Sequence, residues 1–228
     1  MTSPKAHPLT TPRAAALAGV LFGLLFGTAL VLIRTALPAG AEEGAQWLDA
    51  GSQRMKVAVI LMPFAGIAFL WFIGVVRDGF GRIEDKFFSS VFIGAGLTFL
   101  AMVFSASAIG AGLVASSRHV VDVTAHAEVA TFGQMVLIAL TKTYALRMAA
   151  VFMISLATIW LKTGLMPRWL VIVTYVLALG ILLASDISMW ITLAFPIWVL
   201  IVSALLLARA GVIDLDRDDS AIRPKSRT

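Results

Sequence analysis

The chain has 228 residues, of which 60% are hydrophobic and 14% are charged, with a formal net charge of +5 and no cysteine. Ordinary soluble domains have about 25% charged residues, so this composition excludes that class and indicates several membrane spans. The basic residues flank apolar runs and form no separate patch, which argues against nucleic acid as a partner. Without cysteine the chain has no disulfides and no thiolate metal site.

The apolar runs predict an all-α fold, a polytopic transmembrane helix bundle with six spans. We expect residues 1–13 to be a cytoplasmic tail, 14–208 to be the six-helix transmembrane domain, and 209–228 to be a disordered cytoplasmic tail. The expected spans are 14–33, 57–76, 87–114, 142–161, 169–185 and 187–208.

The first span carries a row of small residues, since Gly19, Gly23 and Gly27 recur at four-residue spacing. Small residues on one face let another helix approach closely, which favours helix packing in lipid. The row therefore predicts a helix contact, with another helix of this chain preferred over a second copy.

Arg34 is expected to begin the first loop, which continues to Lys56 and holds a short interfacial helix at Trp47 and Leu48. Pro63 predicts a kink or local unwinding in the second span. The turn after that span is the densest charge cluster of the chain. It is interpreted as a cytoplasmic turn and, alternatively, as a docking site for a partner; its charged residues are Arg77, Asp78, Arg82, Glu84, Asp85 and Lys86.

Residues 115–133 form the second polar connection and contain one weak metal candidate. In a helix His119, Asp122 and His126 would share a face, and two imidazoles with a carboxylate suit a divalent transition metal. No fourth ligand is apparent, so a solvated polar face is the preferred interpretation, and no metal or other cofactor is expected.

The most informative stretch is 131–162, because Arg147 interrupts an otherwise apolar run. A charge at that depth costs about 2.5 to 3.5 kcal/mol on insertion scales and usually has a partner. On a regular helix Arg147 shares a face with four polar residues, which predicts a polar stripe: Thr143, Tyr144, Ser155 and Thr158. We expect Arg147 to pair with Asp186, which lies in the tight turn between the fifth and sixth spans, with Glu128 or Asp122 as the alternative partner.

The distribution of Lys and Arg predicts the orientation. Six spans place both termini on one side with the turns at 77–86 and 162–168, and most basic residues lie on that side. Because basic residues are enriched in cytoplasmic loops, we expect a multi-pass protein of the plasma membrane with its N and C termini inside.

Three stretches carry a resemblance to known sequences: FLWFIGVVRD around Arg77, LRMAAVFMIS around Arg147 and LMPRWL around Pro167. They resemble an uncharacterised bacterial family of six-helix integral membrane proteins. The resemblance implies the same fold and a plasma-membrane location. It implies no activity and no catalytic residue.

No catalytic or nucleotide-binding motif occurs in the sequence. The first interpretation is therefore a non-enzymatic structural or accessory membrane component, in contact with the lipid bilayer and with another membrane protein or a homo-oligomer. The second is a small transporter or permease built on the polar stripe around Arg147. The third, a membrane metal-binding protein or enzyme, depends on the convergence of His119, Asp122 and His126.

Overall fold

The computed structural model describes residues 11–37, 46–78, 86–116, 123–184 and 189–209. Throughout these residues every regular element is a helix and none is a strand, which confirms the predicted all-helical class. The helices in chain order are α1 (Thr11–Ala36), α2 (Gln46–Asp78), α3 (Lys86–Ser116), α4 (Val123–Ile138), the π-helix η2 (Ala139–Ala145), α5 (Leu146–Thr163), α6 (Arg168–Ala184), the 3-10 helix η3 (Met189–Leu193) and α7 (Ala194–Arg209).

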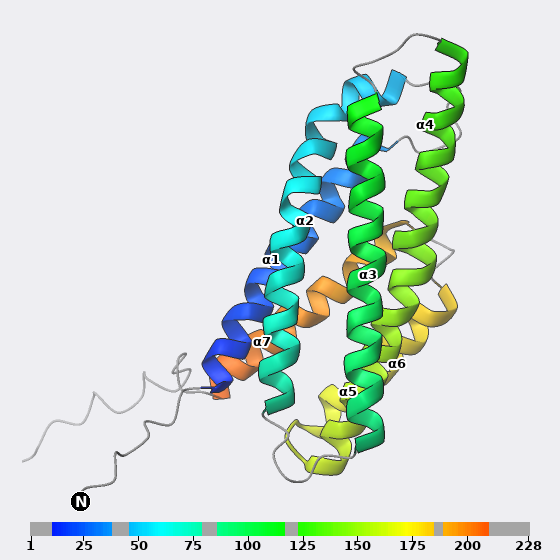
Figure 1. The fold of residues 1–228 in the computed structure, drawn as a ribbon. Helices are drawn as coiled ribbons and strands as arrows, with labels where there is room; N and C mark the ends of the chain where they lie inside the picture. Colours follow the sequence, from blue (N-terminus) through cyan, green and yellow to red (C-terminus); the bar gives the residue numbers. More distant parts are fainter. Residues whose placement is uncertain (1–10, 38–45, 79–85, 117–122, 185–188, 210–228) are drawn as a thin grey trace, which may run out of the picture.

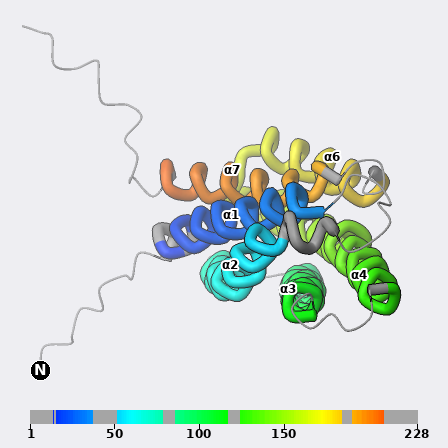
Figure 2. The backbone as a smooth tube through the Cα atoms, turned by 90° about the horizontal axis from the view of Figure 1, so that it is seen from above, coloured from blue at the N-terminus to red at the C-terminus, as the bar shows by residue number. Residues whose placement is uncertain are grey.

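The helices form one elongated bundle (Figure 1). Helix α1 lies between α2 on one side and α7 on the other, and α3 packs against α2, α4 and α5 (Figure 2). Helix α6 packs mainly on α5. Since α4, η2 and α5 follow one another without a break, residues 123–163 run through the bundle as a single long helical segment.

Five helical segments are long and apolar enough to cross a membrane: Ala16–Ala36, Ser52–Asp78, Lys86–Ser116, Thr124–Thr163 and Trp190–Ala208. The chain is therefore a membrane protein. The apolar helix Arg168–Leu183 is shorter than these, so the predicted fifth span, 169–185, and with it the total of six spans, is not confirmed.

Several predicted boundaries are wrong. The helix that carries the fourth span begins at Val123, far before residue 142, so most of the predicted polar connection at 115–133 is helical. Trp47 and Leu48 belong to the first turn of α2, so they do not form a separate interfacial helix. Arg34 lies inside α1, which ends two residues later, so it does not begin a loop.

Helix α2 continues through Pro63 as one helix, so the predicted unwinding does not interrupt it. Proline has no amide hydrogen, and the carbonyl of Val59, four residues earlier, therefore has no amide donor. The Ser107 hydroxyl of α3 lies 3.5 Å from this carbonyl oxygen and donates to it. A neighbouring helix thus replaces part of the hydrogen bond that Pro63 removes, as membrane helices commonly do.

The interior of the bundle is filled by aromatic rings. Phe69 of α2 is fully buried, and its ring centroid lies 4.5 Å from that of Phe22, 5.3 Å from Phe99, 5.2 Å from Phe152 and 5.8 Å from Phe195. These rings come from α1, α3, α5 and α7, so one cluster joins five helices. Edge-to-face and tilted ring pairs each add about 0.5 to 1.5 kcal/mol to area burial.

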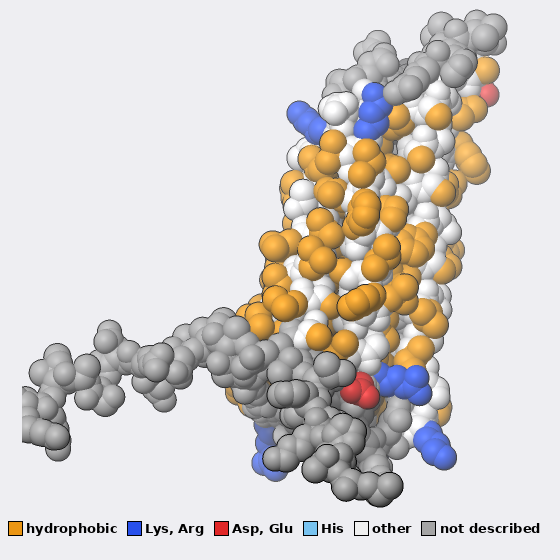
Figure 3. All heavy atoms as spheres, turned by 60° about the vertical axis from the view of Figure 1, so that its left-hand side comes forward, with side chains coloured by type: hydrophobic (Ala, Val, Ile, Leu, Met, Phe, Trp, Pro, Cys, Tyr) orange, Lys and Arg blue, Asp and Glu red, His pale blue; other side chains and the backbone are white. Residues whose placement is uncertain are grey.

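Hydrophobic side chains cover the middle of the outer surface, and basic side chains lie toward its two ends (Figure 3). On α2, Lys56 and Arg77 are separated by about 32 Å at 1.5 Å per residue, close to the thickness of about 30 Å of a bilayer core. Lys142 and Lys162 are separated by about 30 Å on the η2–α5 segment by the same arithmetic. The exposed apolar band between these residues, which includes Phe64 and Trp71, matches a lipid-facing surface.

Candidate functional site

Arg34 is the one charged side chain that is buried among the described residues, with 8% of its surface exposed. It lies in the last turn of α1, where the partial negative charge of the helix C-terminus favours a cation. It follows Leu30 by four residues and Gly27 by seven, and these spacings place all three on one helix face. Arg34 therefore stands at the end of a face that packs inside the bundle.

The Arg34 guanidinium has few acceptors around it. Its Nη2 donates to Thr192 Oγ1 of η3 over 3.4 Å, which is long for a hydrogen bond. Its Nε and Nη1 are buried and have no hydrogen-bond partner in the described part of the chain. An unsatisfied buried donor costs about 1 to 3 kcal/mol, and more when the group is charged. Such a cation needs an explanation beyond packing.

Two irregular helices lie at this end of the bundle: η3, which holds Thr192, contacts both α1 and η2. Pro196 follows η3 and cannot donate to the carbonyl of Thr192, four residues earlier, which accounts for the irregular start of α7. In the π-helix η2 each amide donates to the carbonyl five residues earlier, instead of four as in an α-helix. One carbonyl at the junction of the two helix types therefore loses its amide donor. The Thr141 hydroxyl donates to Leu137 O over 2.8 Å and lies 3.4 Å from Ile138 O.

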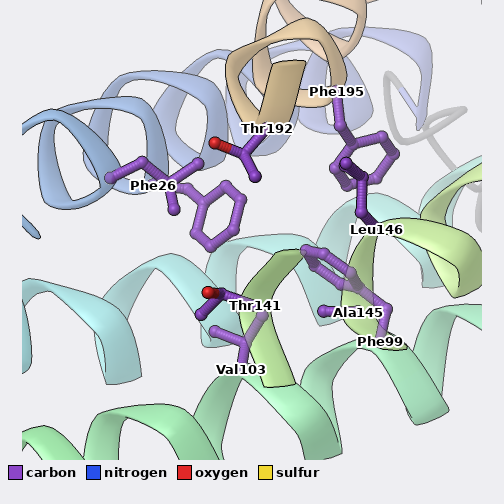
Figure 4. Close-up of a pocket in the computed structure, with 9 residues that line it drawn as sticks. Phe26, Phe99, Val103, Thr141, Ala145, Leu146, Thr192 and Phe195 are labelled. Atoms are coloured by element: carbon purple, nitrogen blue, oxygen red, sulfur yellow. The ribbon is translucent and has the colours of Figure 1, made fainter. Parts of the chain in front are cut away.

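A small cavity of about 10 Å³ lies between these irregular helices and the aromatic core, and it has about the least volume that holds one water molecule. The hydroxyl-bearing residues Thr141 and Thr192 approach it from opposite sides (Figure 4). Apolar side chains make up the rest of the lining: Phe26, Leu30, Phe99, Val103, Ala145, Leu146 and Phe195.

A second arginine lies next to Arg34 in space. Arg54 of α2 is exposed, and its Nη1 donates to the carbonyl oxygen of Thr35 over 2.7 Å. Lys56 follows on the same helix and is partly exposed. The end of α1 is thus a basic region that combines one buried guanidinium with exposed cations, and such a region attracts an anionic group.

The sequence pointed instead to Arg147, which the structure places in the first turn of α5, directly after η2. Its side chain is partly exposed, and its Nη1 lies 3.5 Å from the carbonyl oxygen of Thr143, to which it donates. The predicted partner, Asp186, lies outside the described residues. The pair therefore stays a prediction.

The polar stripe on α5 is largely satisfied within the protein. Ser155 is buried and donates to the carbonyl of Val151 over 2.9 Å. Thr158 bonds to its own helix at Ile154 O and lies 2.7 Å from the Tyr175 hydroxyl of α6. Because η2 departs from 100° per residue, the predicted alignment of Thr143 with the residues of α5 does not apply across it.

The glycine row of α1 lies against α7. A Cβ atom at Gly19 would collide with Ser203, and one at Gly23 would lie 2.5 Å from Leu200 Cγ. A Cβ atom at Gly27 would still be 3.9 Å from Pro196. Beside this contact runs an open apolar groove of about 380 Å³ lined by Gly23, Leu24, Gly27, Thr28, Val31, Leu32, Leu193, Pro196, Ile197 and Leu200.

The remaining predicted sites are only partly described. Arg77 and Asp78 are exposed at the end of α2 and Lys86 is exposed at the start of α3, whereas Arg82, Glu84 and Asp85 lie outside the described residues. His126 is partly buried in α4, and both His119 and Asp122 lie outside them. Within the described ranges no group of three His, Cys, Asp or Glu residues could hold a metal ion.

Sequence reasoning missed the buried Arg34 site. An arginine at the end of an apolar run usually marks the membrane boundary, so its position alone did not predict burial. A usable signal was its seven-residue spacing from Gly27, which places it on the packing face of α1.

Comparisons with known proteins found no match for this chain, whether among protein-family models, curated proteins or solved structures. The resemblance to a bacterial six-helix family stays an expectation, and the function is argued from the geometry.

Proposed function

We propose that the chain is a six-helix protein of the cytoplasmic membrane, with both termini in the cytoplasm, and that its role is structural or accessory and non-enzymatic. Helix α6 would be the fifth span. Its 17 residues measure about 26 Å, and a mismatch of a few Å is tolerated at modest cost. Exposed apolar side chains along α6, including Ile172, Val176 and Leu183, support contact with lipid.

The observation that carries the accessory role is the closed aromatic core around Phe69. Rings from five helices meet where a transporter of this size would hold a substrate near the middle of the membrane. The hydroxyls of α5 that would line a pathway bond instead to their own helix or to Tyr175. A bundle with this interior is suited to contacts at its outer surface, with a second membrane protein or another copy.

A small transporter is the second candidate, and the Arg34 region is the observation that favours it. Buried charges and broken helices at one depth are typical of ion and substrate sites in membrane proteins. Here residues of η2 and η3 line a small cavity at one end of the aromatic core, and Arg34 donates to Thr192 of that lining. The positive charge of Arg34 would bind a small anion at that level. This binding step does not itself require an open pathway through the bundle.

Gentle extraction from the native membrane followed by native mass spectrometry separates the two functions. The accessory role predicts a complex of fixed stoichiometry with a second copy or with another membrane polypeptide. Purified protein reconstituted into vesicles should then carry no solute flux above that of empty vesicles. A monomer that catalyses saturable flux of a small anion, and loses it in Arg34→Gln, would contradict the accessory role and favour transport.

A further inference from the structure

The apolar groove between α1 and α7 leads toward Arg34. It extends along α1 from Gly23 to Leu32, a rise of about 14 Å, and ends two residues before Arg34. On α7 and η3 it ends at Leu193, next to Thr192, which accepts the hydrogen bond from Arg34. Two independent features thus meet, an apolar groove open at its outer edge and a buried cation with two donors that have no partner in the described part of the chain.

We propose that this site binds an anionic phospholipid, with an acyl chain in the α1–α7 groove and the phosphate on Arg34. The groove is lined almost entirely by apolar atoms, and exposed Leu24 and Ile197 form its open edges toward the bilayer. A hydrocarbon chain is therefore the chemistry that fits it.

The phosphate follows from charge and position. Guanidinium groups bind phosphate through several hydrogen bonds at once, and the Nε and Nη1 atoms of Arg34 supply donors that need an acceptor. Arg34 lies at the end of a span of 21 residues, the level at which headgroups meet the protein. A long arginine side chain can turn toward the interface while its aliphatic part stays buried.

Neighbouring cations strengthen the match. Arg54 donates to the carbonyl oxygen of Thr35, one residue from Arg34, and so adds a second guanidinium at this end of α1. Cations near a membrane surface attract anionic lipid, and basic pockets between helices bind phosphate headgroups. The site should therefore prefer anionic phosphatidylglycerol to zwitterionic phosphatidylcholine.

The groove can be closed without touching Arg34. At Gly27 a Cβ atom would have its nearest neighbour, Pro196, at 3.9 Å, so Gly27→Ala should be accepted and serves as the control. Gly27→Phe would place a ring in the groove and compete with an acyl chain.

The test measures which lipid the intact protein retains. The protein is reconstituted in nanodiscs of equal parts phosphatidylglycerol and phosphatidylcholine, extracted in mild detergent and analysed by native mass spectrometry. We expect the wild type to retain one phosphatidylglycerol over phosphatidylcholine by about tenfold, the ratio expected for charged hydrogen bonds. Arg34→Gln and Gly27→Phe should abolish this preference, whereas Gly27→Ala and Arg77→Gln, which removes an exposed charge at the other end of α2, should preserve it.

Three results would overturn the proposal. Equal retention in Arg34→Gln and Arg77→Gln would show that the Arg34 charge does not select lipid. Should Arg34→Gln fail to fold, Gly27→Phe decides, because unchanged retention there would show that the groove holds no acyl chain. Inorganic phosphate that raises the melting temperature as much as phosphatidylglycerol does would assign the site to a free anion.

Discussion

The middle of the bundle and the Arg34 end differ in the side chains that fill the space between the helices. In the middle, Phe22, Phe69, Phe99, Phe152 and Phe195 fill the space with rings, and the helices around them are regular. At the Arg34 end a π-helix and a 3-10 helix each contribute a threonine to a small cavity, and the Arg34 guanidinium donates to one of these two hydroxyls. The aromatic rings of the first region hold the helices together, and the basic and hydroxyl groups of the second region are suited to bind an anionic group.

This difference separates stability from function within one small protein. Large losses of stability should follow changes in the aromatic core, whereas changes at the Arg34 end should affect ligand retention more than folding. Four substitutions test that division, beginning with the one that should cost the most stability.

Phe69→Ala should have the largest effect, because it removes the ring at the centre of the aromatic cluster. Truncation of a buried phenylalanine costs about 3 to 5 kcal/mol in unfolding free energy. Phe64→Ala on the same helix is the matched control, since that ring is 57% exposed to the lipid side. Thermal unfolding of the detergent-solubilised protein measures both. Similar losses in the two variants would contradict the central role of the cluster.

Gly23→Leu should destabilise the bundle by about 1 to 3 kcal/mol through overpacking. Even a single Cβ atom there would lie 2.5 Å from Leu200 Cγ and 3.1 Å from Pro196 O. Gly74→Leu is the control, because a Cβ atom at that position meets nothing within 4 Å. Equal melting temperatures for both variants in mild detergent would show that α1 and α7 are not packed this closely.

Thr158→Val should cost only about 0.6 kcal/mol, the average for a hydrogen bond between membrane helices. It keeps the shape of the side chain and removes the 2.7 Å contact with Tyr175. Tyr175→Phe removes the same contact from the other side, so the double variant should lose no more than either single one. Additive losses of melting temperature would mean that the two hydroxyls act separately.

Arg34→Met should leave stability unchanged or raise it slightly when anionic lipid is absent. The substitution removes two buried donors that have no partner in the described part of the chain, and replacing a poorly satisfied buried charge by an apolar residue is often neutral or stabilising. Lys56→Met, at a partly exposed position nearby, is the control. A loss as large as that of Phe69→Ala would show that the guanidinium is firmly paired.

The helical class and most membrane segments could be predicted from hydropathy, because apolar runs of about 20 residues have few alternatives in lipid. The four-residue spacing of Gly19, Gly23 and Gly27 likewise identified a face of α1 that lies against α7. These features depend on local composition and spacing, which the sequence contains directly.

Other features depend on the neighbours that a segment finds in the fold. Residues 123–138 contain His126 and Glu128 and resemble a polar connection, yet they continue the helix because α3 packs beside them. The π-helix at 139–145 contains no glycine or proline that would predict an irregular turn. The Thr141 hydroxyl donates to the carbonyl oxygen of Leu137 at its start. Arg34 looked like an ordinary boundary residue, and only the positions of α7 and η3 show that it is buried.

The closed interior can be tested most directly by the reactivity of single cysteines, which is possible because the chain has none of its own. Ser155→Cys places a thiol at a buried position of α5, and Glu128→Cys places one at an exposed position of α4. In native membranes we predict that a small water-soluble thiol reagent modifies Glu128→Cys rapidly and leaves Ser155→Cys unmodified. Comparable rates at the two positions would reveal a water-filled path through the bundle and would contradict the closed aromatic core.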